Sequence, residues 1–478
     1  MTHEPLAPGA PEETAAAQAP ADGTPPTSTQ HARTTAVGTP LGAGVTRRPG
    51  RWLDGWNPEN EAQWIAVGRR IARRNLSTSV YAEFLGFVVW ALWSVVVPQL
   101  PAAGFDLTVD QMFWLIAVPS LVGATLRIPY TFAVPVLGGR NWTVVSALLL
   151  LLPLTALVLV VQDPTTSFGT LLLVASLAGL GGGNFASSMA NISFFYPESG
   201  KGRALGLNAA GGNLGTAAVQ LVVPLVVVTA TGVHLERAGL LIIPLVLLAA
   251  VLAWRGMDNL RGARSDTKAY AQAATHGHTW LISAIYIGTF GSFIGFSSVF
   301  PTLLKGTFPE VTVSIAFLGA LVGSVARPLG GTLADRLGGA RITLVALTVM
   351  AAGVIGAILA LRAGSFAGFL GSFLVLFVAT GAGNGSVYRM IPAVFRHGAT
   401  DDADRAHRAR VAAGCLGIAG AVGAFGGFLV PRGFAASTAA TGGIEAALWV
   451  VVGVYAVLGA LTWAVYARRG STLGAAGV

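Results

Sequence analysis

Two arginines lie inside apolar stretches, at equivalent places of a repeated pattern. The motif LVGATLR ends at Arg127, and the related motif LVGSVAR ends at Arg327, 200 positions later; both stretches continue to Leu-Gly-Gly. A charge at bilayer depth costs roughly 2.5–3.5 kcal/mol on insertion scales, so an arginine there indicates a functional site. Because the repeat relates the two arginines, they predict a pseudo-symmetric pocket for a negatively charged ligand.

Two further segments, 179–195 and 206–215, are rich in small residues. Small residues let helices approach closely in lipid, where apolar burial cannot drive association. Four asparagines accompany them or fall on the repeat: Asn184, Asn208, Asn213 and Asn384. An asparagine amide donates hydrogen bonds without adding charge. These side chains therefore either bind the ligand or join neighbouring helices.

The elements that must position these residues are membrane-spanning helices. Of the 478 residues, 53% are hydrophobic and 11% charged, whereas a soluble protein carries about 25% charged residues. About twelve apolar runs are long enough to cross a ~30 Å hydrocarbon core as helices, and none shows the ~10-residue alternation of β-barrel strands. The sequence predicts an all-α membrane protein with twelve transmembrane helices in two pseudo-symmetric six-helix halves.

The net charge of +9 follows membrane topology. Most Lys and Arg residues fall in loops on the side of the N-terminal tail, and the loops of the other side hold Arg237, Lys305, Arg362 and Arg432. Cytoplasmic loops carry the excess of positive residues. We therefore expect a multi-pass protein of the cytoplasmic (inner) membrane with both termini cytoplasmic, and no nucleic-acid partner.

The chain divides into six expected parts, which differ in composition and charge. They are a disordered cytoplasmic tail (1–52), an amphipathic or basic surface helix (53–76), an N-terminal six-helix half (77–255), a cytoplasmic linker (256–279), a C-terminal six-helix half (280–467) and a cytoplasmic tail (468–478). Equal halves joined by a polar loop fit a parallel repeat about an axis along the membrane normal, the arrangement of major facilitator transporters.

One loop resembles the conserved loop motif of that superfamily. Residues 331–341 read GTLADRLGGAR and contain Asp335, Arg336 and Arg341. The resemblance implies an acid-dependent conformational latch. The corresponding loop of the N-terminal half has Pro135 in the place of the acid, so the latch is expected in one half. The side chain of Arg389, near the end of a span, is expected to extend toward the lipid headgroups.

The segments around the two arginines resemble a narrower family. Residues 183–195 read GNFASSMANISFF, and residues 206–215 read GLNAAGGNLG. Together with RIPYTF at 127–132 and YIGTFGSFIGF at 286–296, they resemble the nitrate signature of the nitrate/nitrite porter (NarK-type) family of the major facilitator superfamily. The resemblance extends over roughly residues 70–470.

The resemblance implies the roles of particular side chains. Arg127 and Arg327 would clamp the anion, and Phe185 and Phe290 would sandwich its plane. Asn213 and Tyr286 would donate hydrogen bonds to it. Asn184, Asn208 and Asn384 would support the site. The implied function is a secondary transporter that moves nitrate and nitrite by alternating access, with the anion clamped between the two arginines.

The chemistry of the side chains suits a small planar anion. A guanidinium is a planar fork that can meet two oxygens of one ligand together, and flat aromatic walls would exclude tetrahedral anions such as sulfate by shape. Nitrite shares the planar charge of nitrate, so weak discrimination between them is expected. The alternatives are a transporter of another small planar anion and a nitrate sensor on a transporter fold.

The sequence does not determine which ion drives transport. Nitrate stays deprotonated at biological pH, so coupling to protons needs a titratable protein group, and Glu83 is the well-embedded carboxylate of the spans. Glu83 either carries a proton, or balances the arginine charges when no anion is bound, or lies near the interface without a role. The couplings considered are nitrate/nitrite antiport and nitrate/H+ symport.

Other classes of function find no support in the sequence. No convergent His, Cys or carboxylate cluster indicates an enzyme, a metal site or a cofactor, and Cys415 is the single cysteine. The expected partners are nitrate, nitrite, possible co-transported protons and the lipid bilayer. A single chain is expected to form the transport unit.

Overall fold

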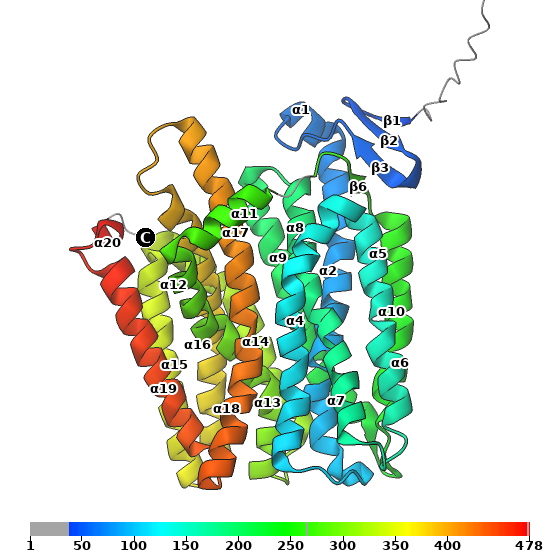
Figure 1. Ribbon diagram of the computed structural model, residues 1–478, viewed down its shortest axis with the longest axis vertical. Coiled ribbons are helices and arrows are strands. Elements are labelled where there is room, and N and C mark those ends of the chain that lie inside the picture. The colour runs from blue at the N-terminus through cyan, green and yellow to red at the C-terminus, as the bar shows by residue number, and fades with distance from the viewer. Residues whose placement is uncertain (1–37, 264–265, 476–477) are drawn as a thin grey trace, which may run out of the picture. The chain divides into compact units, whose positions relative to one another are not determined.

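The computed structural model describes residues 38–263, 266–475 and 478. The first 37 residues of the expected N-terminal tail lie outside this range. The described chain is a bundle of helices with a small β-sheet at one end (Figure 1). We call this end of the bundle the sheet end and the other the opposite end.

Twelve helical segments of the described residues are long and apolar enough to cross a membrane, which confirms the predicted all-α fold class. They are Glu61–Gln99, Val109–Leu137, Gly139–Val160, Phe168–Phe195, Glu198–Val227, Glu236–Gly256, Gly277–Thr307, Val313–Leu337, Gly339–Arg362, Phe366–Arg396, Asp402–Thr441 and Glu445–Ala467.

Several of these segments consist of more than one helix. The helices of the N-terminal half are α1 (Glu61–Gln63), α2 (Arg69–Ala91), α3 (Trp93–Val96), α4 (Val109–Leu137), α5 (Gly139–Leu149), α6 (Leu151–Val160), α7 (Phe168–Leu177), α8 (Gly179–Phe195), α9 (Glu198–Val227) and α10 (Glu236–Gly256). Those that follow are α11 (Thr267–Thr275), α12 (Gly277–Tyr286), α13 (Ser292–Thr307), α14 (Phe317–Leu337), α15 (Gly339–Arg362), α16 (Phe366–Arg396), α17 (Asp402–Ala424), α18 (Gly426–Thr441), α19 (Glu445–Thr462) and α20 (Thr472–Ala475).

The repeat seen in the sequence is also a structural repeat. Helix α4 ends at Leu137 and α14 ends at Leu337, and each is followed by a glycine with positive φ, 86° at Gly138 and 94° at Gly338. Glycine adopts that backbone conformation without a steric penalty. The two arginine-bearing helices therefore end in the same way, 200 residues apart.

Two spans are interrupted close to the middle of the bundle. Between α12 and α13 lies a π-helical turn, Ile287–Gly291, which carries Phe290. Helices α17 and α18 are separated at Phe425. Single π-helical turns inside α-helices are frequent at functional sites because they redirect a side chain.

The sheet corrects the prediction that residues up to 52 are disordered. Strands β1 (Thr39–Gly42), β2 (Val45–Arg48) and β3 (Trp52–Asp54) form an antiparallel meander, and β3 pairs in parallel with β6 (Asn259–Leu260). A second, two-stranded sheet, β4 (Val228–Thr229) and β5 (Gly232–Val233), follows α9. Local composition could not reveal the first sheet, because its last strand comes from about 200 residues further along the chain.

A buried carboxylate fastens the sheet to the helices. Asp258 is fully buried, and it forms ion pairs with Arg47 (3.3 Å), Arg51 (2.9 Å) and Arg74. Its backbone N–H also donates to the side chain of Asn75 on α2, at 2.8 Å. Burial lowers the pKa of Arg51, and the charge of Asp258 opposes that shift. One side chain thus links strand β2 and the turn that follows it to the first span.

The expected surface helix over 53–76 is not a separate element. Its first residues belong to β3, and from Glu61 the chain is helical without a break into the first span. Ile71 and Ala72 are buried in a cluster with Val45 and Leu53 of the sheet. Because the sheet covers this face, the helix continues into the first span and does not lie along the membrane surface. The expected linker over 256–279 likewise contains β6 and α11.

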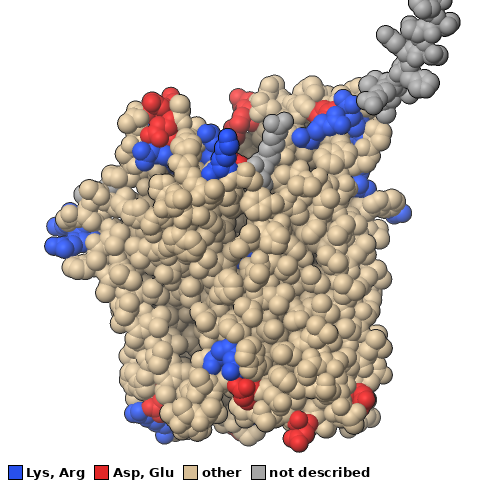
Figure 2. All heavy atoms as spheres, in the orientation of Figure 1, with Lys and Arg blue, Asp and Glu red and all other residues tan. Residues whose placement is uncertain are grey.

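Charged side chains gather at the two ends of the bundle. Figure 2 shows blue and red atoms at the sheet end and at the opposite end, with a broad band almost free of charge between them. Such a band matches the hydrocarbon region of a bilayer. The buried arginines lie behind this band, inside the bundle.

Candidate functional site

The two predicted arginines lie inside the bundle, on helices of different halves. Arg127 on α4 is 1% exposed and Arg327 on α14 is 6% exposed. Buried charges in proteins are normally paired with an opposite charge or bind a ligand. Within the described chain, neither guanidinium has a carboxylate in an ion pair.

Arg127 is held by backbone carbonyls from both halves. Its Nε donates to the carbonyl of Gly182 on α8 at 3.2 Å, and its Nη1 donates to the carbonyl of Gly420 on α17 at 2.6 Å. Its Nη2 is buried and has no hydrogen-bond partner among the described residues. One face of the guanidinium fork is therefore fixed, while one donor remains for another molecule.

Arg327 is arranged similarly. Its Nη2 donates to the hydroxyl of Tyr286 on α12 at 3.2 Å. Its Nη1 is buried, and no partner for it is found in the part of the chain that the structure describes. A buried donor without a partner costs about 1–3 kcal/mol, so each arginine gains if an acceptor meets its free nitrogen.

Aromatic rings lie against both guanidiniums. The Phe185 ring centroid is 4.5 Å from the Arg127 Cζ and 5.9 Å from the Arg327 Cζ. For Phe290 the two distances are 5.2 and 5.7 Å. The two rings face each other at 6.3 Å with an interplanar angle of 30°. The structure thus brings together all four residues that the sequence predicted as clamp and walls.

Tyr286 also belongs to this group, and Tyr388 extends it. The Tyr286 ring stacks on Phe290 at 5.1 Å, and Tyr388 on α16 lies 5.1 Å from the Arg327 Cζ. The sequence analysis missed Tyr388. It follows Asn384 by four residues, one turn of the same helix, so helical periodicity was the signal that could have found it.

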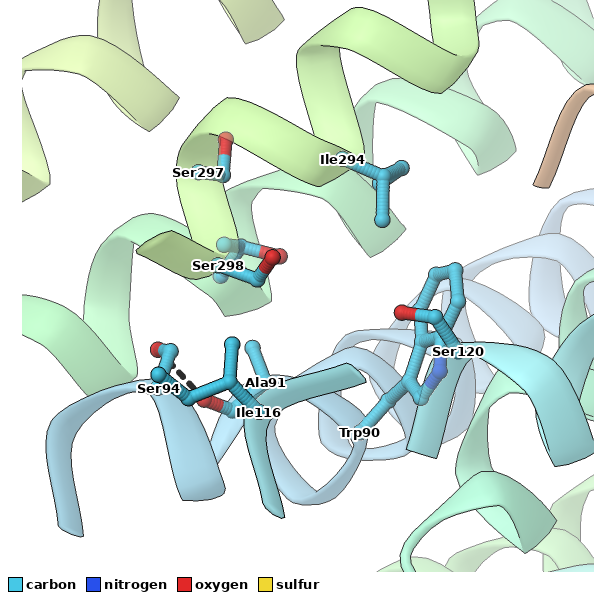
Figure 3. Close-up of a pocket in the computed structure, with 9 residues that line it drawn as sticks. Trp90, Ala91, Ser94, Ile116, Ser120, Ile294, Ser297 and Ser298 are labelled. Carbon is cyan, nitrogen blue, oxygen red and sulfur yellow. Dashed lines mark hydrogen bonds between the residues drawn. The ribbon is translucent and has the colours of Figure 1, made fainter. Parts of the chain in front are cut away.

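Trp90 on α2 was also missed. Its ring lies 5.4 Å from the Arg127 Cζ, and its Nε1 donates to the carbonyl of Pro119 at 2.9 Å. Trp90 also lines a pocket between α2, α3 and α4 on one side and α13 on the other (Figure 3). Ser94, Ser120, Ser297 and Ser298 give this pocket polar walls. It therefore reaches from near Arg127 into the interface between the halves.

Glycines let the helices beside the arginines approach each other closely. A Cβ on Gly182 would meet Trp90 and the backbone of Gly123 on α4, and a Cβ on Gly381 would meet the backbone of Gly323 on α14. The glycines between α4 and α8 thus have counterparts between α14 and α16. This close approach lets Arg127 reach the carbonyl of Gly182.

The four predicted asparagines divide into two groups. Asn213 and Asn384 are buried, and both amide atoms of each lack a hydrogen-bond partner within the described residues. Asn208 instead donates from Nδ2 to Glu83 Oε2 at 2.6 Å. Asn184 lines a second pocket beside Glu83. The structure therefore associates Asn208 and Asn184 with the carboxylate.

Glu83 on α2 is 1% exposed and lies within the N-terminal half. Its Oε1 is buried with no partner in the described chain, and a Cβ on Gly212 of α9 would meet that oxygen. The expectation that Glu83 is embedded is confirmed by this burial. The reading in which it lies solvated near an interface is wrong, because four helices enclose it.

The latch residues lie at the sheet end. Asp335 and Arg389 form an ion pair at 3.0 Å, with each side chain about half exposed. Arg336 and Arg341 are exposed, and the described residues offer them no ion-pair partner. Asp335 therefore joins α14 to α16 within the C-terminal half.

On one side of the arginines the N-terminal half meets the C-terminal half, and on the other side it meets the linker helix α11. At the opposite end, Arg432 on α18 pairs with Asp110 on α4 at 2.9 Å and lies 4.2 Å from the ring of Trp114. Toward the sheet end, Phe132 on α4 packs against Tyr270 on α11 at 5.5 Å. The arginine pair is thus enclosed from both directions.

A bundle of twelve spans in two repeated halves, with charged side chains buried between them, defines a membrane transporter. A family model for the Major Facilitator Superfamily matches residues 82–411. Among solved structures, a bacterial homologue of the human lysosomal transporter Spinster aligns with a TM-score of 0.62 at 17% identity, covering 81% of this chain and 95% of that one. A D-xylose–proton symporter aligns with the same TM-score at 14% identity, covering 82% and 97%. At these identities the structures support the fold alone.

Curated relatives narrow the family. The nitrate/nitrite transporters NarU of Salmonella typhimurium and of Escherichia coli are each 41% identical over 447 residues, which cover 87% of this chain and 96% of theirs. The probable nitrate/nitrite antiporter NarK2 of Thermus thermophilus is 36% identical over 449 residues, covering 88% and 98%. The chain belongs to the nitrate/nitrite porter family of the major facilitator superfamily, a family of transporters and not of enzymes.

Proposed function

We propose that the protein moves nitrate and nitrite across the cytoplasmic membrane by alternating access, with the anion held between Arg127 and Arg327. The observation that carries this proposal is the pair of free donors: each buried arginine keeps one terminal nitrogen without a partner in the described chain. The names of the relatives support nitrate and nitrite as the anions. Because one chain supplies both arginines, a single chain forms the transport unit.

The shape of the site supports a planar anion. A guanidinium fork offers donors in one plane, which match the oxygens of nitrate better than the compact ammonium of lysine would. Phe185 and Phe290 lie against both guanidiniums and face each other, so they supply flat apolar walls beside the two charges. In this proposal Tyr286 orients Arg327, and Asn213 supplies further hydrogen bonds. Asn384 supports the same site.

The contacts between the halves support alternating access. The pair Asp110–Arg432 closes the opposite end, and Phe132 with Tyr270 closes the sheet end. If the halves rock about the arginines, these two sets of contacts break in turn. The excess of Lys and Arg at the sheet end makes this end cytoplasmic by the positive-inside rule. The N-terminal sheet then lies in the cytoplasm, with both termini.

Two modes of coupling are compatible with the buried charges. Two arginines without an anion leave excess positive charge inside the bundle, which disfavours reorientation and favours exchange of one anion for another. Net uptake needs a cation to enter with nitrate. A proton on Glu83 is one such cation, so exchange and symport predict different driving forces.

The experiment uses the full-length chain in liposomes. Uptake of labelled nitrate is followed with nitrite inside the vesicles or absent, and with or without a pH gradient. Wild type is expected to take up nitrate against internal nitrite, and Arg327→Ala is expected to abolish uptake. Absence of anion transport in wild type, or full transport by Arg327→Ala, overturns the proposal.

Two matched controls separate the site from general damage. Arg362→Ala removes an exposed arginine at the end of α15, where it pairs with Glu445. This variant should transport nitrate normally. Sulfate added in excess should not compete with nitrate, because its tetrahedral shape does not fit between Phe185 and Phe290. Competition by sulfate as strong as that by nitrite would contradict the planar pocket.

A further inference from the structure

The second pocket is lined by residues of the N-terminal half alone, and neither arginine is among them. It is a small cleft between α2, α5 and α8. Its lining is polar apart from one alanine. The lining residues are Ser79, Ala82, Glu83, Thr143, Ser146, Asn184, Ser187 and Ser188.

Three hydroxyl groups of the pocket already donate their hydrogens within the helices. The hydroxyl of Thr143 donates to the carbonyl of Gly139 at 2.8 Å, and that of Ser187 donates to the carbonyl of Asn184 at 3.0 Å. The Ser146 hydroxyl donates to a carbonyl of its own helix at 3.3 Å. Since these hydrogens are used within the helices, the lone pairs of the hydroxyl oxygens remain available to a ligand.

Two further oxygens of the lining are buried without partners among the described residues. They are Glu83 Oε1 and Asn184 Oδ1. The amide Nδ2 of Asn208 fixes the other carboxylate oxygen of Glu83 at 2.6 Å and also bonds to Ser188. The carboxylate is therefore oriented, and its free oxygen shares the pocket with the free oxygen of an amide.

We propose that this pocket binds a sodium ion that enters together with the transported anion. Hard cations take several oxygen ligands, from carboxylates, amides and hydroxyls, and in many secondary transporters a coupling ion binds near the substrate. A proton would need only the carboxylate and would leave the amide and hydroxyl oxygens without a role. Glu83 is the one carboxyl group of the lining, and its ionised form would match the charge of a monovalent cation.

Electrostatics would link this site to the anion. Arg127 and Arg327 are positive charges buried within the same bundle as the pocket. They repel a cation in the pocket, and an anion bound between them reduces that repulsion. Nitrate should therefore raise the affinity for Na+, and Na+ should raise the affinity for nitrate by the same factor. This step rests on the proposed function, because it needs the anion between the arginines.

Binding is tested first, without transport. The thermal midpoint of the full-length protein in detergent is measured as Na+ replaces choline, with nitrate or with chloride as the anion. Wild type should be stabilised by Na+, and half-saturation should fall several-fold when nitrate is present. Glu83→Gln should weaken Na+ binding roughly tenfold or more. Glu445→Gln, the same change at an exposed carboxylate, should leave it unchanged.

Transport measurements distinguish a failure of the sodium site from a failure of the proposed function. Nitrate/nitrite exchange in Na+-free vesicles reports the arginine site alone, and its failure in wild type would overturn the proposed function. Nitrate uptake into nitrite-free vesicles should need an inward Na+ gradient and should be lost in Glu83→Gln. If exchange is intact but Na+ neither stabilises nor drives uptake, or if only a pH gradient drives it, the sodium site is overturned.

A second variant decides the outcome if Glu83→Gln does not fold. Thr143→Val keeps the size of the side chain and removes one oxygen of the lining. It should raise the Na+ concentration for half-maximal uptake several-fold while leaving nitrate/nitrite exchange in choline at the wild-type rate. An unchanged Na+ requirement in Thr143→Val would then overturn the sodium site.

Discussion

The Nη1 of Arg127 donates to the carbonyl of Gly420, 2.6 Å away, and this hydrogen bond joins the arginine of one half to a helix of the other. Gly420 lies on α17, near the point where this span is interrupted. A residue proposed to bind the anion is therefore also a link between the halves. If the anion draws on the same guanidinium, binding and the contact between halves become coupled.

The arginine pair gives the first prediction. In Arg127→Lys and Arg327→Lys the positive charge remains, but the planar fork and its free terminal nitrogen are lost. A hydrogen bond to a charged group contributes about 1.5–3 kcal/mol, so the dissociation constant for nitrate should rise roughly 10- to 100-fold in each variant. Titration calorimetry of the purified protein measures this change.

The exposed Arg362 provides the matched control. Arg362→Lys should bind nitrate as wild type does, because this side chain pairs with Glu445 at the surface. If Arg127→Lys and Arg327→Lys also bind normally, charge alone holds the anion and the planar fork has no role.

The sequence predicted the centre of this site because its signals are local. An arginine in an apolar run stands out without any knowledge of its neighbours, and the repeat placed Arg127 and Arg327 together before the fold was known. The Leu-Gly-Gly that both stretches reach is also the place where α4 and α14 end in the structure. The aromatic walls, Phe185 and Phe290, came from the family resemblance.

The remaining parts depend on contacts between distant segments. Gly420 contributes only a backbone carbonyl, which any residue type could supply, so its sequence carries no sign of the contact. The sheet of residues 39–54 needs a strand at Asn259–Leu260 and the carboxylate of Asp258. Read alone, this stretch has too few large apolar residues to predict a folded structure.

Asp258 gives the second prediction. It is fully buried and pairs with three arginines. Asp258→Asn leaves these positive charges without a partner, and breaking a buried ion pair costs about 3–5 kcal/mol. The thermal midpoint in detergent should fall by several degrees, whereas folded protein should keep its affinity for nitrate. Asp163→Asn, at an exposed loop carboxylate, should leave the midpoint unchanged.

A double-variant cycle identifies the source of that loss. Arg74→Ala should destabilise the wild type but have a much smaller effect in Asp258→Asn, because the partner is already absent. Equal effects in both backgrounds would mean that Arg74 and Asp258 do not act as a pair.

The latch residues give the third prediction. Asp335 and Arg389 are each about half exposed, and an exposed ion pair contributes about 0–1 kcal/mol. Asp335→Asn should therefore change the rate of nitrate/nitrite exchange by no more than roughly fivefold. Initial rates in liposomes measure it. A complete loss of exchange in Asp335→Asn would show that the carboxylate does more than pair with Arg389.

The contact between α4 and α18 gives the fourth prediction. Asp110 and Arg432 pair at 2.9 Å across the halves at the opposite end. In a chain carrying Asp110→Cys and Arg432→Cys, a short bis-maleimide reagent should join the two helices and stop nitrate/nitrite exchange. The native Cys415 is buried and should not react. Each single-cysteine variant, treated with the same reagent, should keep most of its exchange activity. Exchange that continues after the cross-link has formed would contradict opening at this end, because alternating access requires α4 and α18 to separate in every cycle.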